Sequence, residues 1–192
     1  MSSFPRTMVG GVSLSRMIVG TNWFLGFSHT TPSKDQYICD HVRDRKKMAD
    51  IIEVFLRSGV DTIMGLIAMP PLADAVKEAE DRTGVGAIVV STPAFPVGPE
   101  TPEKGLDQGA VDAIVEEQAK KGARFCFPHT STTDALVDRC TRTIRHIGQI
   151  TESVRAHGMI PGLSTHMPEA IVYADESGID IETYISLYNS MG

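Results

Sequence analysis

The chain has 192 residues, of which 42% are hydrophobic and 22% are charged, and these proportions are typical of a globular protein rather than a disordered one. Its formal net charge is −6, and Lys and Arg are scattered along the sequence, which argues against nucleic acid as a partner. The three cysteines lack C-x-x-C spacing, so neither a disulfide framework nor a thiolate zinc site is expected, and a reducing cytoplasm fits best.

The N-terminal segment MSSFPRTMVGGVSLSRMIVG has no uninterrupted apolar core of the signal-peptide type. No apolar run approaches the roughly 20 residues that a membrane-spanning helix needs. We therefore expect a soluble protein that is not exported and has no membrane partner.

One unit recurs along the chain, in which a helix-like segment passes through a glycine into a short apolar run. Each glycine is placed where a helix end needs a left-handed residue, and basic residues precede four of the five. The apolar runs do not alternate, as is typical of parallel strands that are covered on both faces. The glycines are Gly59, Gly84, Gly122, Gly158 and Gly178, and with a first strand at MIVGTNWF the sequence predicts six strands that start near residues 17, 60, 85, 123, 159 and 179.

Strands that alternate with helices indicate parallel βα units, which form either a (β/α) barrel or an open doubly wound sheet. The first strand is not followed by a G-x-G-x-x-G turn, so the usual nucleotide-binding form of the open sheet lacks its key residues. Polar residues follow several different strands, as barrel sites require. We therefore predict an α/β fold of the TIM-barrel type, as a single domain over residues 1–192, although a closed barrel usually takes about 250 residues.

Three segments, RMIVGTNWFLGFSHT, FPHTSTTDALVDR and GMIPGLSTHMPEAIVYADESGIDIETYISLYNSMG, resemble an uncharacterised group of bacterial proteins predicted to be (β/α)8 barrels and distantly similar to the aldo-keto reductases. The resemblance covers nearly the whole chain and implies the barrel fold, but no activity. Proteins of that group are longer by two βα units. Either the chain is a shortened form or it is an incomplete barrel of six units, whose open strand edges a homo-oligomer would cover.

Three histidines lie at predicted strand ends, where barrel enzymes carry their sites. His29 follows the first strand, His129 ends the fourth and His166 ends the fifth. We expect His129 and His166 to approach each other and to be the catalytic candidates, and the three rings together predict a divalent metal site for zinc, manganese or iron. The alternative is that each histidine caps a helix or binds a backbone carbonyl. Few acids are near, and Asp134 stands three residues after Ser131, as the acidic partner in a capping box would.

Hydroxyl and amide side chains beside these histidines suit a polyol, carboxylate or phosphate substrate. Their alternative role is the ordinary capping of the helices that follow. The candidates for substrate binding are Ser28, Thr130, Ser131, Ser164, Thr165 and, on the sixth strand, Asn189.

Two further features carry weaker predictions. The loop over residues 91–105 holds five of the eleven prolines and is either a stiff lid over the site or a rigid surface loop. Cys126 lies inside an apolar strand, where we expect an unreactive thiol.

Three functions remain open from the sequence. The first is a metal-assisted lyase, isomerase or hydrolase that acts on a small polar metabolite. The second is an NAD(P)H-dependent oxidoreductase like the aldo-keto reductases, whose site includes a histidine after the fourth strand, as His129 is here, but no lysine stands at a strand end. The third is a non-catalytic binding or assembly domain.

Overall fold

A computed structural model describes residues 4–186 of the chain. The chain forms two compact units that divide between Ser91 and Thr92, and each unit is described by itself. The prediction of a single domain stays a prediction. Within residues 4–186, every helix is too short or too polar to cross a lipid bilayer.

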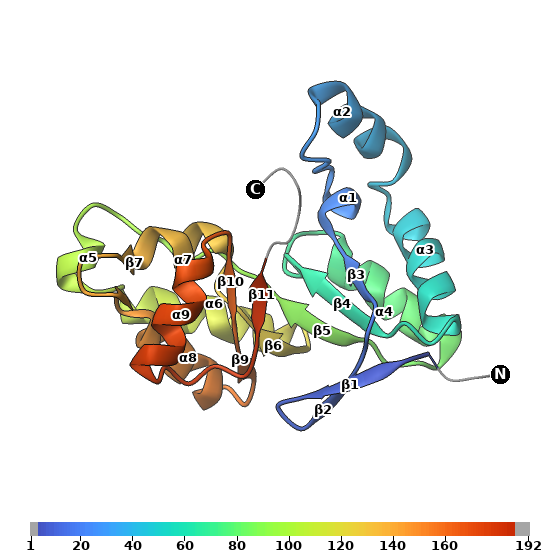
Figure 1. Ribbon diagram of the computed structural model, residues 1–192. Helices are drawn as coiled ribbons and strands as arrows, with labels where there is room; N and C mark the ends of the chain where they lie inside the picture. The colour runs from blue at the N-terminus through green and yellow to red at the C-terminus, as the bar shows by residue number, and fades with distance from the viewer. Residues whose placement is uncertain (1–3, 187–192) are drawn as a thin grey trace. The chain divides into compact units, whose positions relative to one another are not determined.

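The first unit opens with a hairpin and continues with three parallel strands and the helices between them (Figure 1). Its elements are β1 (Arg6–Val9), β2 (Val12–Ser15), β3 (Ile18–Gly20), α1 (Asn22–Leu25), α2 (Pro32–His41), α3 (Arg45–Arg57), β4 (Thr62–Gly65), α4 (Leu72–Thr83) and β5 (Ile88–Ser91).

The parallel strands of the first unit pair in the order β3, β4, β5, with Val19 beside Ile63 and Ile63 beside Val89. Helices α3 and α4 run side by side next to these strands (Figure 1). One face of α3 is buried, since Met48 and Ile52 have no exposed surface. This unit therefore has the core expected for repeated βα elements.

The hairpin of β1 and β2 was not predicted. Its strands pair antiparallel from Arg6 beside Ser15 to Val9 beside Val12. The turn between them consists of Gly10 and Gly11, with φ of 52° and 76°, and two positive φ values in a two-residue loop are the mark of a tight hairpin turn. The VGGV sequence carries this signal.

The second unit alternates helices with short strands and contains a second hairpin, β7 with β8 (Figure 1). Its elements are α5 (Thr101–Lys104), α6 (Gln108–Lys120), β6 (Ala123–Cys126), α7 (Thr130–Leu136), β7 (Val137–Asp138), β8 (Thr143–Ile144), α8 (Ile147–Ala156), β9 (Ile160–Pro161), β10 (Leu163–Thr165), α9 (Pro168–Ser177) and β11 (Tyr184–Ser186).

The predicted fifth strand is divided at Gly162. Its first part, β9, pairs in parallel with β6, and its second part, β10, pairs in parallel with β11. A Cβ atom at Gly162 would lie 2.4 Å from the ring of Phe127, which is 2% exposed. The absence of a side chain at Gly162 therefore lets Phe127 fill the core beside Phe125, and the two rings meet edge to face with their centroids 6.1 Å apart.

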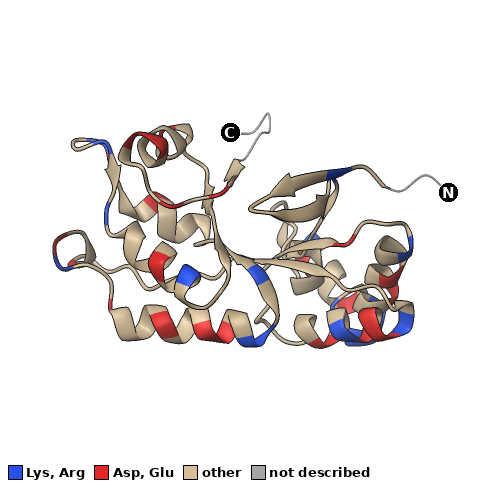
Figure 2. Ribbon diagram, turned by 90° about the horizontal axis from the view of Figure 1, so that it is seen from below, with Lys and Arg blue, Asp and Glu red and all other residues tan. Residues whose placement is uncertain are grey.

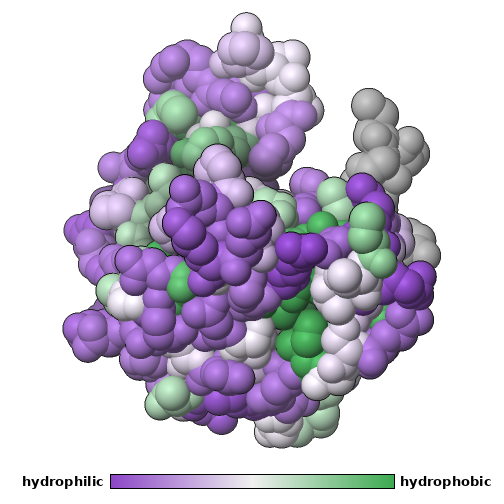
Figure 3. All heavy atoms as spheres, turned by 90° about the vertical axis from the view of Figure 1, so that its left-hand side faces the viewer, coloured by the Kyte–Doolittle hydropathy of each residue, from purple (hydrophilic) through white to green (hydrophobic). Residues whose placement is uncertain are grey.

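A strand lies in each of the six predicted runs, and the fold is α/β with parallel strands. The first strand ends at Gly20 because Asn22–Leu25 form α1, and the sixth begins at Tyr184 rather than near residue 179. The five predicted helix-ending glycines all have positive φ, from 64° at Gly178 to 82° at Gly59, so their predicted conformation is confirmed. Closure of the strands into a barrel stays a prediction. Most of the surface in Figure 3 is hydrophilic, and hydrophobic residues show in several separate places.

Candidate functional site

His129 stands at the junction between the buried end of β6 and the first turn of α7. It is the N-cap residue of α7, and its Nδ1 accepts the backbone N–H of Ser131 at 3.2 Å and lies 2.8 Å from the Ser131 hydroxyl. Its own backbone N–H donates to the carbonyl of Pro93 at 2.8 Å. Because Nδ1 accepts a backbone N–H, the proton of the neutral ring lies on Nε2. His129 is therefore a cap as well as a site candidate.

Asp134 connects α7 to the end of β10. Its carboxylate accepts the hydroxyl of Thr130 at 2.9 Å, the hydroxyl of Thr165, and the backbone N–H of His166 at 3.1 Å. Its side chain is 16% exposed. The predicted capping box was wrong, because His129 caps the helix, and this leaves Asp134 to bind the neighbouring strand end.

The ring of His166 lies beside this carboxylate. Its Nδ1 is 3.9 Å from Oδ2 of Asp134, and its side chain is 56% exposed. The loop that holds it is short, since Met167 donates its backbone N–H to the Thr165 hydroxyl at 2.9 Å before α9 begins. An imidazole next to a carboxylate and open to solvent is equipped for proton transfer. We call Asp134 and His166 the Asp134–His166 pair.

The predicted hydroxyl groups of the second unit serve mainly internal bonds. Thr130 and Thr165 donate to Asp134, and Ser131 bonds His129. Ser164 is buried within β10, at 9% exposure. Asn189 lies outside the described residues.

His29 belongs to the first unit, in the segment between α1 and α2. Its Nε2 is 2.9 Å from the side-chain nitrogen of Asn22, its ring is exposed, and its backbone is in the left-handed region with φ of 56°. Ser28 bonds Thr30 through the two hydroxyls and donates its backbone N–H to Asp35. The hydrogen bond from Ser28 is the main cause that lowers the pKa of Asp35.

The predicted metal site needs His, Cys, Asp or Glu side chains that lie close enough together to bind one ion. Within residues 4–186, no three His, Cys, Asp or Glu side chains are grouped as the ligands of a metal ion would be. In addition, Nδ1 of His129 already accepts a backbone N–H. The residues that the structure describes therefore do not fit a three-ligand metal site.

The proline-rich loop of the second unit, from Thr92 onward, is held by side chains of α7 and α8. The Thr132 hydroxyl accepts the N–H of Phe95 at 2.8 Å and donates to its carbonyl at 3.3 Å. Gln149 bonds both the N–H and the carbonyl of Leu106, at 2.9 and 3.2 Å. These bonds favour the rigid loop over the lid.

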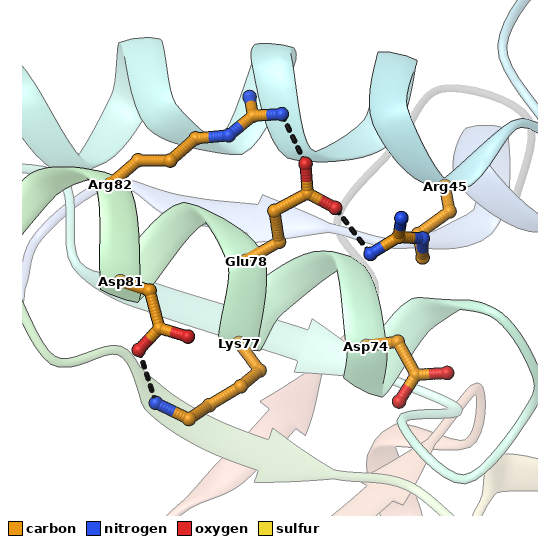
Figure 4. Close-up of a pocket in the computed structure, with 6 residues that line it drawn as sticks. All are labelled: Arg45, Asp74, Lys77, Glu78, Asp81 and Arg82. Carbon is orange, nitrogen blue, oxygen red and sulfur yellow. Dashed lines mark hydrogen bonds and ion pairs between the residues drawn. The ribbon is translucent and has the colours of Figure 1, made fainter.

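A hollow of about 590 Å³ lies between α3 and α4, in the first unit (Figure 4). Arg82 bonds Asp50 at 2.6 Å and also contacts Glu78, whose other oxygen is 2.5 Å from Arg45. Figure 2 shows basic and acidic residues next to each other on these helices. Each cation of the lining has an acidic neighbour, so this network stabilises the helix pair and leaves no unpaired cation of the lining for an anionic ligand. The lining residues are Arg45, Asp74, Lys77, Glu78, Asp81 and Arg82.

One buried hydroxyl of the first unit has no hydrogen-bond partner among the described residues. It is Oγ1 of Thr21, at the end of β3, and the residue is 2% exposed. A Cβ atom on Gly65, at the end of β4, would lie 1.7 Å from it. The hydroxyl therefore packs against the glycine backbone.

Comparison with known proteins gives a likeness of fold alone. No family model and no curated protein sequence matches the chain. It resembles the carboxyl transferase domain of Rhizobium etli pyruvate carboxylase with pyruvate, at 11% identity and a TM-score of 0.52, over 88% of this chain and 32% of that chain. The same domain with 3-bromopyruvate gives 10% identity and a TM-score of 0.52 over the same shares. This chain thus spans about a third of those structures, and they resemble it as α/β folds.

Proposed function

We propose that the protein is an enzyme that moves a proton on a small carbonyl compound, with His166 as the base. The observation that carries the proposal is the Asp134–His166 pair at the carboxyl end of β10. Catalytic groups in βα folds stand at this end of the strands because the loops there are built on a rigid frame.

The two members of the Asp134–His166 pair have different proposed roles. Because Nδ1 of His166 faces Asp134, we assign contact with substrate to Nε2. The carboxylate, held by two hydroxyls and a backbone N–H, orients the ring and stabilises the charge that the ring gains with a proton.

The substrate class that we propose is a 2-oxo acid. The carbonyl of such a compound makes the neighbouring C–H acidic, and a positioned imidazole can take that proton. The solved structures that share the fold are named with pyruvate and with 3-bromopyruvate, which makes pyruvate the first compound to test. The hydroxyls of Thr130 and Thr165 bond Asp134, so their proposed role is to support the base rather than to bind substrate.

Proton exchange tests the proposal directly. Pyruvate is incubated with the protein in deuterium oxide, and the loss of its methyl proton signal is followed by NMR. The base removes a C3 proton to give the enolate, and a deuteron from solvent replaces it. We expect the wild type to accelerate exchange and His166→Gln to lose about 100-fold of that acceleration.

The matched control is His41→Gln, which changes an exposed histidine in the first unit whose ring bonds the carbonyl of Tyr37. It should exchange pyruvate like the wild type. Equal rates in the wild type and His166→Gln would reject His166 as the base. Repeating the assay after chelation, and with added zinc or manganese, tests the metal requirement predicted from the sequence.

The oxidoreductase and the non-catalytic functions stay predictions. A fluorescence titration with NADPH decides the first of them. Sedimentation of the purified protein tests the predicted homo-oligomer, which the third function needs.

A further inference from the structure

The hairpin of β7 and β8 follows α7 directly and reaches α9. Asp138 organises its turn by accepting the backbone N–H of Cys140 at 2.9 Å and the hydroxyl of Thr141 at 2.8 Å, and it also contacts Arg145. The hairpin is therefore a stiff extension of the helix that carries Asp134.

Two arginines of this hairpin bind glutamates at opposite ends of α9. Arg139 donates through Nε and Nη2 to one oxygen of Glu169, at 3.0 and 2.6 Å, and its Nη2 lies 3.7 Å from the sulfur of Met167. Arg142 donates to the carboxylate of Glu176 through Nε and Nη2, and its guanidinium lies 4.9 Å from the ring centre of Tyr173. The first contact is at the start of α9, next to His166, and the second is at its end.

These contacts hold the segment around His166 from two sides. On one side Asp134 holds Thr165 and the backbone of His166, and on the other side Arg139 holds Met167 and Glu169. Thr165, Met167 and Glu169 are thus each contacted by a side chain from α7 or from the hairpin that follows it. The ring of His166 is exposed, so its direction depends on this backbone.

Glu169 is well suited to be the anchor of Arg139. A hydrogen bond that its carboxylate accepts from its own backbone N–H, and then the bond from Arg139, lower the pKa of this carboxyl. It lies in the first turn of α9, where a negative charge is favourable. It therefore stays ionised and available to the guanidinium at neutral pH.

We infer that Arg139 is a positioning residue for His166: by binding Glu169 and Met167 it sets the orientation of the imidazole against Asp134. This inference rests on the proposed function for its kinetic test, but it also predicts a structural signal that needs no activity.

The test compares Arg139→Gln with Arg142→Gln, because both remove an arginine of the same hairpin that binds a glutamate of α9. Two quantities are measured: the exchange kinetics with pyruvate, and the proton–carbon NMR signal of the His166 ring. We expect R139Q to lower kcat by about fivefold, the scale of an exposed ion pair, with KM little changed, and to move the His166 signal. R142Q should leave both quantities unchanged.

A double-mutant cycle assigns the effect to the pair with Glu169. If Arg139 acts through Glu169, R139Q/E169Q should lose no more kcat than R139Q does alone. Arg139→Lys keeps the positive charge but not the planar guanidinium that donates from two nitrogens, so it should give an intermediate loss of kcat. It serves as the second variant if R139Q folds poorly.

The results that would overturn the positioning role differ from the result that would reject the proposed function. A His166 signal that is unmoved in R139Q, or moved equally in R142Q, overturns the inference, and so do fully additive losses in the double variant. If the wild type exchanges no proton, the proposed function fails, but the NMR comparison of R139Q with R142Q still supports or overturns the positioning role.

Discussion

Asp134 and His166 are joined through the backbone as well as through their side chains. Oδ2 of the carboxylate accepts the N–H of His166 at 3.1 Å and lies 3.9 Å from Nδ1 of its ring. One acidic residue on α7 thus fixes both the position of the loop after β10 and the charge next to the imidazole. A change at Asp134 should therefore alter stability and chemistry together.

Asp134→Asn tests the stability part. An amide offers one acceptor oxygen in place of two, but three donors meet this side chain, from Thr130, Thr165 and His166. We expect the free energy of unfolding to fall by about 1–3 kcal/mol. Urea unfolding measures the loss. Thr130→Val removes one donor and should cost about 1 kcal/mol, and an Asn variant as stable as this control would contradict the shared role of the carboxylate.

The stability of the second hairpin should depend on pH through Asp138. Hydrogen bonds from Thr141 and then from Arg145 lower the pKa of this carboxyl from 3.8 to about 2. A lowered pKa stabilises the fold above the ordinary value, and the contribution is lost as pH falls from about 4 to about 2. The difference in unfolding free energy between the wild type and Asp138→Asn should shrink over that range. A difference that stays constant would exclude Asp138 as its source.

Gly65→Ala should be strongly destabilising. The new Cβ would lie 1.7 Å from Oγ1 of Thr21, and φ at this position is 147°, where side chains are strained. We expect a loss of about 2–4 kcal/mol in unfolding free energy. Gly20→Ala is the matched control at the end of the paired strand β3, because no atom lies within 4 Å of its Cβ position. Equal losses in the two variants would show that the contact with Thr21 is relieved at little cost.

The network between α3 and α4 should be sensitive to salt. Arg82 is bound to Asp50, Glu53 and Glu78, and its side chain is 29% exposed. Arg82→Met should lower the midpoint of thermal unfolding, and the difference should narrow from about 0.05 M to about 0.5 M NaCl because salt screens ion pairs. Lys77→Met breaks a pair that is 69% and 65% exposed and should change the midpoint less. A larger effect of Lys77→Met would contradict the network.

The cysteines should differ in reactivity. Burial raises the pKa of the Cys126 thiol to about 12, and the residue has no exposed surface, whereas Cys140 is exposed. A disulfide reagent at about pH 8 should label Cys140 quickly and Cys126 only as the protein unfolds. Cys140→Ser should remove the fast phase. Rapid labelling of Cys126 in the folded protein would contradict its burial.

The repeating βα units could be predicted from the chain because their signals are local. A glycine after a helical segment marks a left-handed helix end at Gly84 or Gly178, and a short apolar run marks a covered strand. The positions of His129 and His166 at strand ends followed from the same reasoning. The VGGV turn was also readable and was missed. The likeness to the uncharacterised bacterial group stays a prediction.

The partners of each side chain were decided by tertiary structure. Sequence spacing placed Asp134 in a capping box with Ser131, but His129 took the cap, and β10 supplied hydroxyl and backbone donors from residues more than thirty positions away. Arg139 and Glu169 likewise meet across a separation of 30 residues. By itself the sequence determined where most helices and strands form, because hydrophobic periodicity and the signals that end a helix depend on residues only a few positions apart. Only the packing of α7, β10 and α9 decided which donors reach Asp134, because such contacts depend on the three-dimensional path of the chain.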